Sequence, residues 1–254
     1  MSASFDDDVI ACAKIVETGD PMRFRTVMAA PVAARAKLFP LYAFNIEVSR
    51  APWVTQEPMI AEMRLQWWRD ALDEIVNGGP VRRHEVVTPL ARVLTPGAAQ
   101  RLDRLIEARR WDVYRVPFET EAAQDQYLEE TTGALTWTAG EMLGAGADGP
   151  LRDAGWGMGM AAFLQAVPAL KAAGRQPLRD ETPAAIAALA ARGVARLAAA
   201  RRGRVKRAAL PALWPASGAL RVLQAAKAAP ERVLSDGLPE YRLRLAWNAM
   251  LRRW

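Results

Sequence analysis

Residues 154–170, AGWGMGMAAFLQAVPAL, form the longest stretch of this chain without a charged side chain. A stretch of that composition has to be buried, either in a membrane or in a protein core. It contains three glycines, a glutamine and a proline, and it is shorter than the roughly 20 apolar residues of a membrane span. We therefore expect a buried central helix surrounded by other helices, and no transmembrane span.

The rest of the chain carries repeated helix signals and almost no strand signals. Asp20-Pro21, Pro31 and Pro58 each mark a helix start, and the sequence Asn-Gly-Gly-Pro at 77–80 marks a helix stop. Ser4 is expected to cap the first helix. We predict an all-α chain of about ten or more helices. Beyond the short helix that starts at residue 20, helices are expected at 31–50, 58–76, 84–94, 96–113, 120–143, 150–173, 182–202, 205–214, 217–229 and 239–251.

Domain organisation and location follow from what the chain lacks. No repeat, heptad run or long linker interrupts residues 1–254, so we predict one domain. The single cysteine, Cys12, cannot form an internal disulfide and is expected to be a small buried side chain. The N-terminus carries three aspartates where a targeting peptide would need positive charge. We expect a cytoplasmic protein.

The positive charge of the chain is concentrated near the C-terminus. Residues 1–146 hold 16 basic and 21 acidic side chains, whereas residues 147–254 hold 18 basic and 7 acidic ones. Such a segment would attract the phosphates of an anionic lipid surface, and its alternative role is to keep the protein soluble. Nucleic acid is not the expected partner. The predicted anionic-surface contacts are Arg192, Arg196, Arg201, Arg202, Arg204, Lys206 and Arg207.

Five motifs occur in a collinear order between about residues 20 and 180. Each is weak alone, but the series resembles the squalene/phytoene synthase family. The motifs are LFPLYAFN at 38–45, EPMIAEMRLQWWRDAL at 57–72, WDVYRVPF at 111–118, YLEETTGAL at 127–135 and AGRQPL at 173–178.

This resemblance implies an all-α, isoprenoid-synthase-type helical bundle around a central cavity. In active family members, two acidic motifs on facing helices hold Mg²⁺ ions that bind a prenyl diphosphate. Carboxylates three or four residues apart lie on one face of a helix, so two such faces can share a metal cluster. The metal neutralises the charge that develops on the departing diphosphate.

Both acidic motifs are absent from this sequence. The family's first motif places its aspartates at Ser49, Arg50 and Trp53, and the second, counted back from Gly174-Arg175, places its acids at Ala166, Ala169 and Leu170. No acid occurs between Asp153 and Asp180. We therefore predict no catalytic residue, no metal ligand and no cofactor, with Mg²⁺ required only if the chain is an active enzyme after all.

Other titratable groups give weaker metal signals. His84 is the only histidine and has no second histidine or cysteine pair to join it. Two acidic groups have metal-like spacing but are expected to be solvated helix faces: Asp70, Asp73 and Glu74, and Glu121, Asp125 and Glu129.

Polar side chains remain where the cavity is expected. Arg64 and Gln66 cannot both face inward at helical spacing. These side chains either fill a core or form a pocket that holds a lipid-like molecule without cleaving it. The predicted pocket-lining residues are Tyr42, Asn45, Glu47, Arg50, Arg64, Gln66, Tyr127, Gln165 and Arg175, beside Trp67 and Trp68.

The sequence looks most like a branch of the family that keeps FNxE and EP-x5-RLQWW, here at 44–47 and 57–68, without the aspartates. Mitochondrial members of that branch are implicated in assembling respiratory complex I. The resemblance implies a non-catalytic protein, peripheral to the inner membrane, that assembles a respiratory complex or binds an isoprenoid or anionic lipid. Its expected partner is a respiratory-complex subunit. The alternative is an active prenyltransferase that condenses prenyl diphosphates, with arginines as diphosphate clamps.

Overall fold

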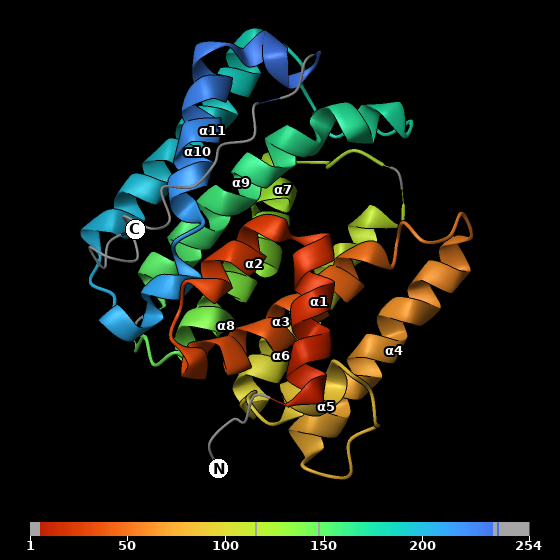
Figure 1. Cartoon of the computed structure of the whole chain (residues 1–254). Coiled ribbons are helices and arrows are strands. Elements are labelled where there is room, and N and C mark those ends of the chain that lie inside the picture. The colour runs from red at the N-terminus through yellow and green to blue at the C-terminus, as the bar shows by residue number, and fades with distance from the viewer. Residues whose placement is uncertain (1–5, 115, 147, 236–237, 239–253) are drawn as a thin grey trace.

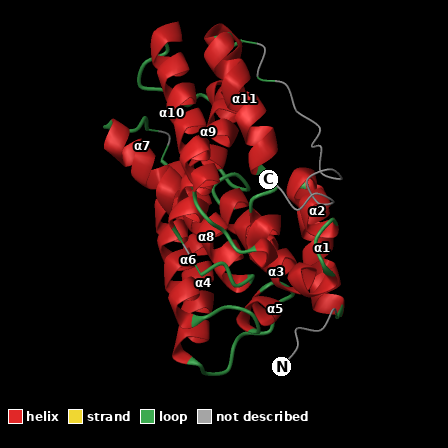
Figure 2. Cartoon of the chain, turned by 90° about the vertical axis from the view of Figure 1, so that its left-hand side faces the viewer, coloured by secondary structure: helices red, strands yellow, loops and turns green. Residues whose placement is uncertain are grey.

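The computed structural model describes residues 6–114, 116–146, 148–235, 238 and 254, and these form helices and loops without a strand (Figures 1 and 2). The all-α prediction is confirmed, while the predicted helix 239–251 lies outside the described residues. The α-helices are α1 (Asp7–Gly19), α2 (Pro21–Met28), α3 (Val32–Arg50), α4 (Pro58–Asn77), α5 (Val87–Ala91), α6 (Pro96–Arg109), α7 (Glu121–Leu128), α8 (Ala134–Met142), α9 (Gly149–Ala172), α10 (Pro183–Arg202) and α11 (Ala216–Ala228).

Local capping signals set several of these helix ends. The N-cap of α1 is Asp6, whose side chain accepts the N–H of Val9, rather than the predicted Ser4, which lies outside the described residues. Asp20 caps α2 in the same way, as expected. Helix α4 begins at Pro58 and ends before Gly78, which adopts the left-handed conformation that favours glycine. These starts and stops are therefore encoded by the nearest residues.

Three predicted helices are shorter or broken in the structure. The helix expected at 84–94 is reduced to α5, because the side chains of Thr88 and His84 accept backbone N–H groups and hold the preceding residues in a turn. The segment 205–214 forms a 3-10 helix, Arg207–Ala212, that contains Pro211. A π-helical segment, Glu129–Gly133, separates α7 from α8.

The uncharged stretch 154–170 lies in α9, and most of its side chains are buried, which confirms the expected central helix. Helices α9, α10 and α11 pack side by side at the upper end of the molecule (Figures 1 and 2). These three helices enclose a first hydrophobic cluster. Helices α1 and α3 to α6 form the other end around a second hydrophobic cluster. Helix α8 and the 3-10 segment contact both ends, so the two clusters are joined.

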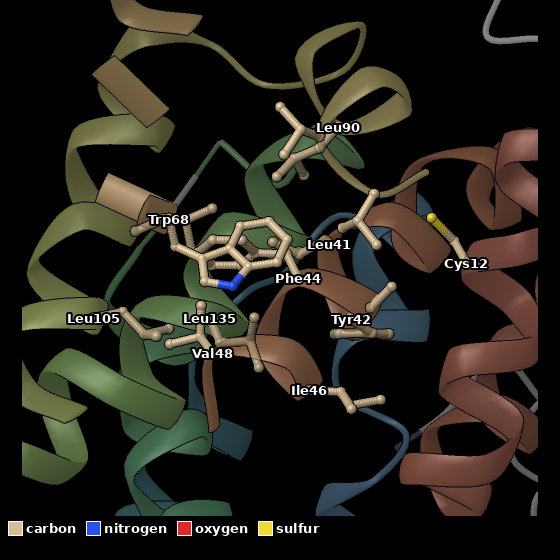
Figure 3. Close-up of a cluster of buried hydrophobic side chains, with 14 of the residues drawn as sticks. Cys12, Leu41, Tyr42, Phe44, Ile46, Val48, Trp68, Leu90, Leu105 and Leu135 are labelled. Atoms are coloured by element: carbon tan, nitrogen blue, oxygen red, sulfur yellow. The ribbon is translucent and has the colours of Figure 1, made fainter. Parts of the chain in front are cut away.

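Helix α3 supplies the middle of the second cluster (Figure 3). Phe44 meets the ring of Trp68 edge to face at a centroid distance of 5.5 Å. Cys12 of α1 packs against this cluster and is fully buried, as predicted, and burial raises the pKa of its thiol to about 12. Because residues 38–46 and Val48 of α3 are buried, the helix is held firmly up to the point where the loop to α4 begins.

Helix α10 is long and apolar enough to span a membrane by length and composition alone. It packs along α9 and α11, and its Arg192 and Arg196 form ion pairs with Asp125 and Asp153. These contacts make α10 a member of the helical bundle in this structure.

Glycine in α9 allows the π-helical segment to approach closely. A Cβ at Gly155 would lie 2.6 Å from the carbonyl oxygen of Thr132 and 2.7 Å from the Cα of Gly133. Both atoms belong to the backbone, so they cannot rotate away. The close contact between α9 and this segment therefore requires glycine at this position.

We predict that Gly155→Ala lowers the free energy of unfolding by about 1–3 kcal/mol through overpacking. The matched control is Gly97→Ala in α6, where a Cβ would meet no atom within 4 Å. Urea unfolding of both variants checks this expectation. Equal stability of the two variants would contradict the steric role of Gly155.

A second stability prediction concerns pH. Burial raises the pKa of Tyr42 to about 12, whereas an unfolded tyrosine titrates near 10. The contribution of the protonated Tyr42 hydroxyl to the free energy of unfolding is therefore present below pH 10 and is lost as the pH rises toward 12. Between pH 9 and pH 11, the wild type is expected to lose about 1 kcal/mol more unfolding free energy than Tyr42→Phe. Urea titrations at both pH values measure the difference, and parallel losses in both proteins would refute it.

Candidate functional site

The two stretches that lack the family's acids meet at one hollow. Its volume is about 770 Å³, and it lies between the loop that follows α3, the start of α4, the segment around Val113 and the end of α9. The sequence places these stretches more than 100 residues apart, so only the packing of the helices joins them. The hollow is lined by Pro52, Trp53, Thr55, Gln56, Glu57, Pro58, Ala61, Val113, Tyr114, Val116, Ala172, Ala173 and Arg175.

A glycine turn aims Arg175 at this hollow. Gly174 has a φ of 74°, and its N–H bonds the carbonyl of Lys171, while the N–H of Arg175 bonds the carbonyl of Leu170 at 3.0 Å. This pair of bonds is a Schellman motif, which ends a helix and reverses the chain. The motif explains why Gly174-Arg175 follows α9 and why the arginine faces back toward the bundle.

Arg175 is a buried cation stacked on Trp53. Its guanidinium carbon lies 4.1 Å from the centre of the Trp53 ring, and its Nη2 donates to the backbone oxygen of Asp112 at 2.5 Å. Only 7% of the residue is exposed. A guanidinium over an indole face is attracted by the ring's negative face. A cation–π contact thus joins the substituted position Trp53 of the first motif to the Gly-Arg sequence that follows the second motif.

The carboxylate of Asp112 is engaged away from the hollow. It accepts hydrogen bonds from Tyr127 Oη at 3.0 Å and from Arg109 Nη1 at 3.1 Å, and Arg109 Nη1 also donates to the tyrosine oxygen at 2.6 Å. Burial raises the pKa of the Tyr127 hydroxyl, which Arg109 lowers and Asp112 raises further. The hydroxyl therefore stays protonated, and Asp112 anchors the segment that supports Arg175.

A second hollow, of about 320 Å³, lies between the end of α3 and α4. The predicted residues Glu47, Arg50 and Arg64 line it, together with Ala51, Val54, Trp67, Trp68 and His84. The imidazole of His84 lies 5.1 Å from the ring of Trp67 and 5.4 Å from that of Trp68, and its Nδ1 accepts the N–H of Val86. The FNxE and RLQWW motifs therefore meet at an aromatic floor with two arginines and one carboxylate beside it.

The squalene/phytoene synthase family model matches residues 16–182, about two thirds of the sequence and all of the segments just described. This chain belongs to the squalene/phytoene synthase family. The match covers the same stretch as the five collinear motifs, so the resemblance read from those motifs is confirmed.

Several curated proteins are similar to this chain in sequence. A Drosophila melanogaster protein named NADH dehydrogenase (ubiquinone) complex I, assembly factor 6 homolog is 32% identical over 178 residues, which cover 65% of this chain and 51% of that protein. The assembly factor 6 proteins of Bos taurus and Homo sapiens are 24% and 22% identical over 161 residues, with 62% of this chain and 48% of each relative covered. The chain spans about half the length of these curated relatives.

Solved structures confirm the fold of the family. A dehydrosqualene synthase in complex with ligand superposes with a TM-score of 0.76 at 14% identity, covering 96% of this chain and 95% of that one. A squalene synthase from Alicyclobacillus acidocaldarius superposes with a TM-score of 0.71 at 16% identity, covering 88% and 94%. The isoprenoid-synthase-type bundle expected from the resemblance is therefore shown.

The residues at the family's metal positions do not fit Mg²⁺. Ser49 donates its hydroxyl to the carbonyl of Ile46, Arg50 is exposed, and Leu170 is a buried apolar side chain. Ala166 and Ala169 offer no side-chain ligand. Among the described residues, no group of three or more His, Cys, Asp or Glu side chains is placed to hold a metal ion. Hard divalent cations need several oxygen ligands at one point.

The remaining predicted pocket residues are placed elsewhere. Tyr42 and Asn45 are buried in the packing of α3, Gln165 is half-buried in α9, and Gln66 is exposed and donates to Asp70 at 2.7 Å. The expectation that Arg64 and Gln66 diverge is met. Sequence reasoning placed Trp53 only among the lost metal positions and considered His84 only as a metal ligand. It assigned no separate role to Tyr114 within the motif at 111–118.

Of the six acids with metal-like spacing, Asp70 and Asp73 are exposed, as expected, and the other four are ion-paired. Glu74 binds Arg82 at 2.6 Å at the end of α4. Glu121 and Asp125 pair with Arg192, and Glu129 pairs with Arg152, so the expected solvated face at α7 is instead a set of contacts to α10 and α9. The guanidinium carbons of Arg192 and Arg196 each lie 5.4 Å from the Trp156 ring centre. Of the predicted basic surface, Arg196 is exposed but paired with Asp153, and Arg201, Arg202, Arg204, Lys206 and Arg207 are exposed as well.

The Arg175–Trp53 contact predicts a measurable coupling. In a double-mutant cycle with Trp53→Leu and Arg175→Met, the coupling free energy is expected to be about 0.5–1 kcal/mol, because Trp53 is only half-buried. The single Arg175→Met change is expected to cost about 1–3 kcal/mol, since the Asp112 carbonyl loses its donor. Urea unfolding of the four proteins gives both values. Additive effects would show that the stacking contributes nothing.

Proposed function

We propose that this chain is a non-catalytic member of the squalene/phytoene synthase family that acts in the assembly of a respiratory complex. The carrying observation is the contact between Arg175 and Trp53 at the meeting point of the two motifs. At Trp53, where the first motif would supply a carboxylate for a divalent cation, this chain has an indole ring that is covered by the Arg175 guanidinium. An arginine can bind phosphate, but it lacks the concentrated charge of a metal cluster at a leaving group.

The similar proteins support the part of the proposal that concerns respiratory-complex assembly. The assembly factor 6 proteins match this chain over the family region, and their names assign them to complex I. By analogy, the partner of this chain would be a subunit or assembly intermediate of a respiratory complex. The proposed location is the cytoplasm, at the periphery of the inner membrane.

We also propose that the larger hollow binds a ligand. The 770 Å³ hollow has Trp53, Val113 and Tyr114 on its walls together with the polar residues Thr55, Gln56 and Glu57, and Arg175 is its buried cation. A site of this size that combines apolar walls with polar groups suits a small amphiphile. The proposed ligand is an isoprenoid or an anionic lipid, bound without cleavage. The exposed basic segment 201–207 would contact an anionic partner.

The assembly role is tested by removing the gene from its host. We expect the deletion strain to lose assembled NADH:quinone oxidoreductase on native gels and to regain it when the gene is restored. Normal levels of the assembled enzyme in the deletion strain would refute the assembly role.

The absence of prenyl transfer is tested with the purified protein. Incubated with Mg²⁺ and farnesyl or geranylgeranyl diphosphate at saturation, the protein is expected to release no diphosphate, while an active family member run in parallel releases it. Mg²⁺-dependent release by this chain would establish the alternative, an active prenyltransferase, and would overturn the non-catalytic assignment.

A further inference from the structure

Exposed apolar side chains gather at one corner of the molecule. Of the eleven large hydrophobic residues that are strongly exposed in the described part of the chain, eight lie within 53–67 or 114–116. The other three, Ile10, Met28 and Val32, belong to the first three helices. A large exposed apolar patch on a folded protein marks an interaction site. The apolar corner, as we call it, consists of Trp53, Val54, Met59, Ile60, Met63 and Trp67.

The first turns of α4 are apolar on both faces. Met59, Met63 and Trp67 are spaced by four residues and lie on the outer face, where Met59 is 75% and Met63 is 66% exposed. Leu65 and Trp68 are buried on the inner face. A helix that only covers a core would be polar on its outer side. The second half of α4 follows this rule, with Asp70, Asp73 and Asn77 exposed.

Cations lie beside the apolar corner. Arg50 and Arg64 line the smaller hollow together with Val54 and Trp67 of the corner. The Arg50 side chain is 62% exposed and lies 3.7 Å from Glu47, and Arg64 forms no ion pair with any described residue. The neighbouring acid Glu62 is neutralised by Arg110 at 2.9 Å, and Glu57 is an exposed acid at the start of α4.

We propose that the apolar corner is a membrane-docking surface, in which α4 inserts its outer methionines among lipid chains while Arg50 and Arg64 pair with headgroup phosphates. The chemistry matches a bilayer that contains anionic phospholipid. Tryptophan favours the boundary between chains and headgroups, and an arginine can keep its charged group at that level. An interfacial helix binds through buried apolar area together with attraction to anionic lipid.

The position of the corner determines which edge of the molecule would face the bilayer. The start of α4 projects at the right-hand edge of the molecule in Figure 1, and the basic segment after α10 lies at the left-hand edge. A flat membrane cannot touch both edges at once. The proposal therefore assigns the membrane to the α4 edge and leaves residues 201–207 facing away from it.

Vesicle flotation with the full-length protein tests this surface. The probes are vesicles of phosphatidylcholine alone and vesicles that also contain phosphatidylglycerol. We expect the wild type to bind the anionic vesicles best and to retain part of that binding at about 0.5 M salt, because apolar insertion is not screened. The Met59→Asp/Met63→Asp variant is expected to bind at least about tenfold more weakly.

Matched variants separate the possible causes of a loss of vesicle binding. Ile10→Asp/Val32→Asp places two acids on exposed apolar positions in the first turns of α1 and α3, where negative charge is tolerated, and is expected to bind like the wild type. Arg50→Gln/Arg64→Gln is expected to lose only the preference for anionic vesicles. Urea unfolding verifies that each variant is folded.

Several results would overturn the proposal. Failure of the wild type to bind either vesicle would do so, as would loss of binding only in Arg201→Glu/Arg202→Glu, which would assign the membrane to the basic segment. A photo-crosslinker at position 63 that captures a protein and no lipid in intact cells would assign the corner to a protein partner. None of these results bears on the assembly role, which the gene deletion tests separately.

Discussion

The close approach of α9 to the helices around it governs the arrangement of the rest of the molecule. At Gly155 the backbone of the π-helical segment occupies the space that a side chain would need, and at Gly157 the side chain of Leu197 does so from α10. Small residues on two sides of one helix let it lie in the centre, with neighbours packed on both faces. The position of α9 in turn fixes where its C-terminal turn delivers Arg175. The hollow therefore depends on packing contacts near the other end of the same helix.

Next to the substituted metal position Trp53 lies a buried cation, Arg175, which belongs to the Gly-Arg sequence that follows the second motif. Arg175 is held by the Asp112 carbonyl and the Trp53 ring, and the Asp112 carboxylate is in turn held by Arg109 and Tyr127. These contacts are specific and mutually supporting, and they occupy the one buried carboxylate among the described residues. A fixed guanidinium attracts an anion without polarising it as a divalent cation does. Such a site is suited to holding a molecule, and this fits a role in assembly.

The sequence predicted the helices whose limits depend on nearby residues. Asp20, Pro58 and Gly78 mark helix ends in the structure because a cap or a left-handed turn acts on adjacent backbone groups. The same reasoning failed at 84–94 and 120–143. There, side-chain hydrogen bonds to the backbone and a π-helical insertion interrupt segments whose apolar spacing fits a continuous helix. Such interruptions arise from interactions that a periodicity analysis does not contain.

By itself, the sequence determined the family, the all-α class and the loss of the metal ligands, because the order of motifs and the identity of side chains are properties of the chain alone. It also placed Glu47, Arg50 and Arg64 among the pocket residues, and the structure brings these three to one hollow. Only the tertiary structure decided that Arg175 meets Trp53, that His84 joins Trp67 and Trp68, and that Arg192 and Arg196 are engaged in ion pairs. Most of these contacts join residues far apart in the chain, and their geometry is set by how the helices pack rather than by spacing along any one of them.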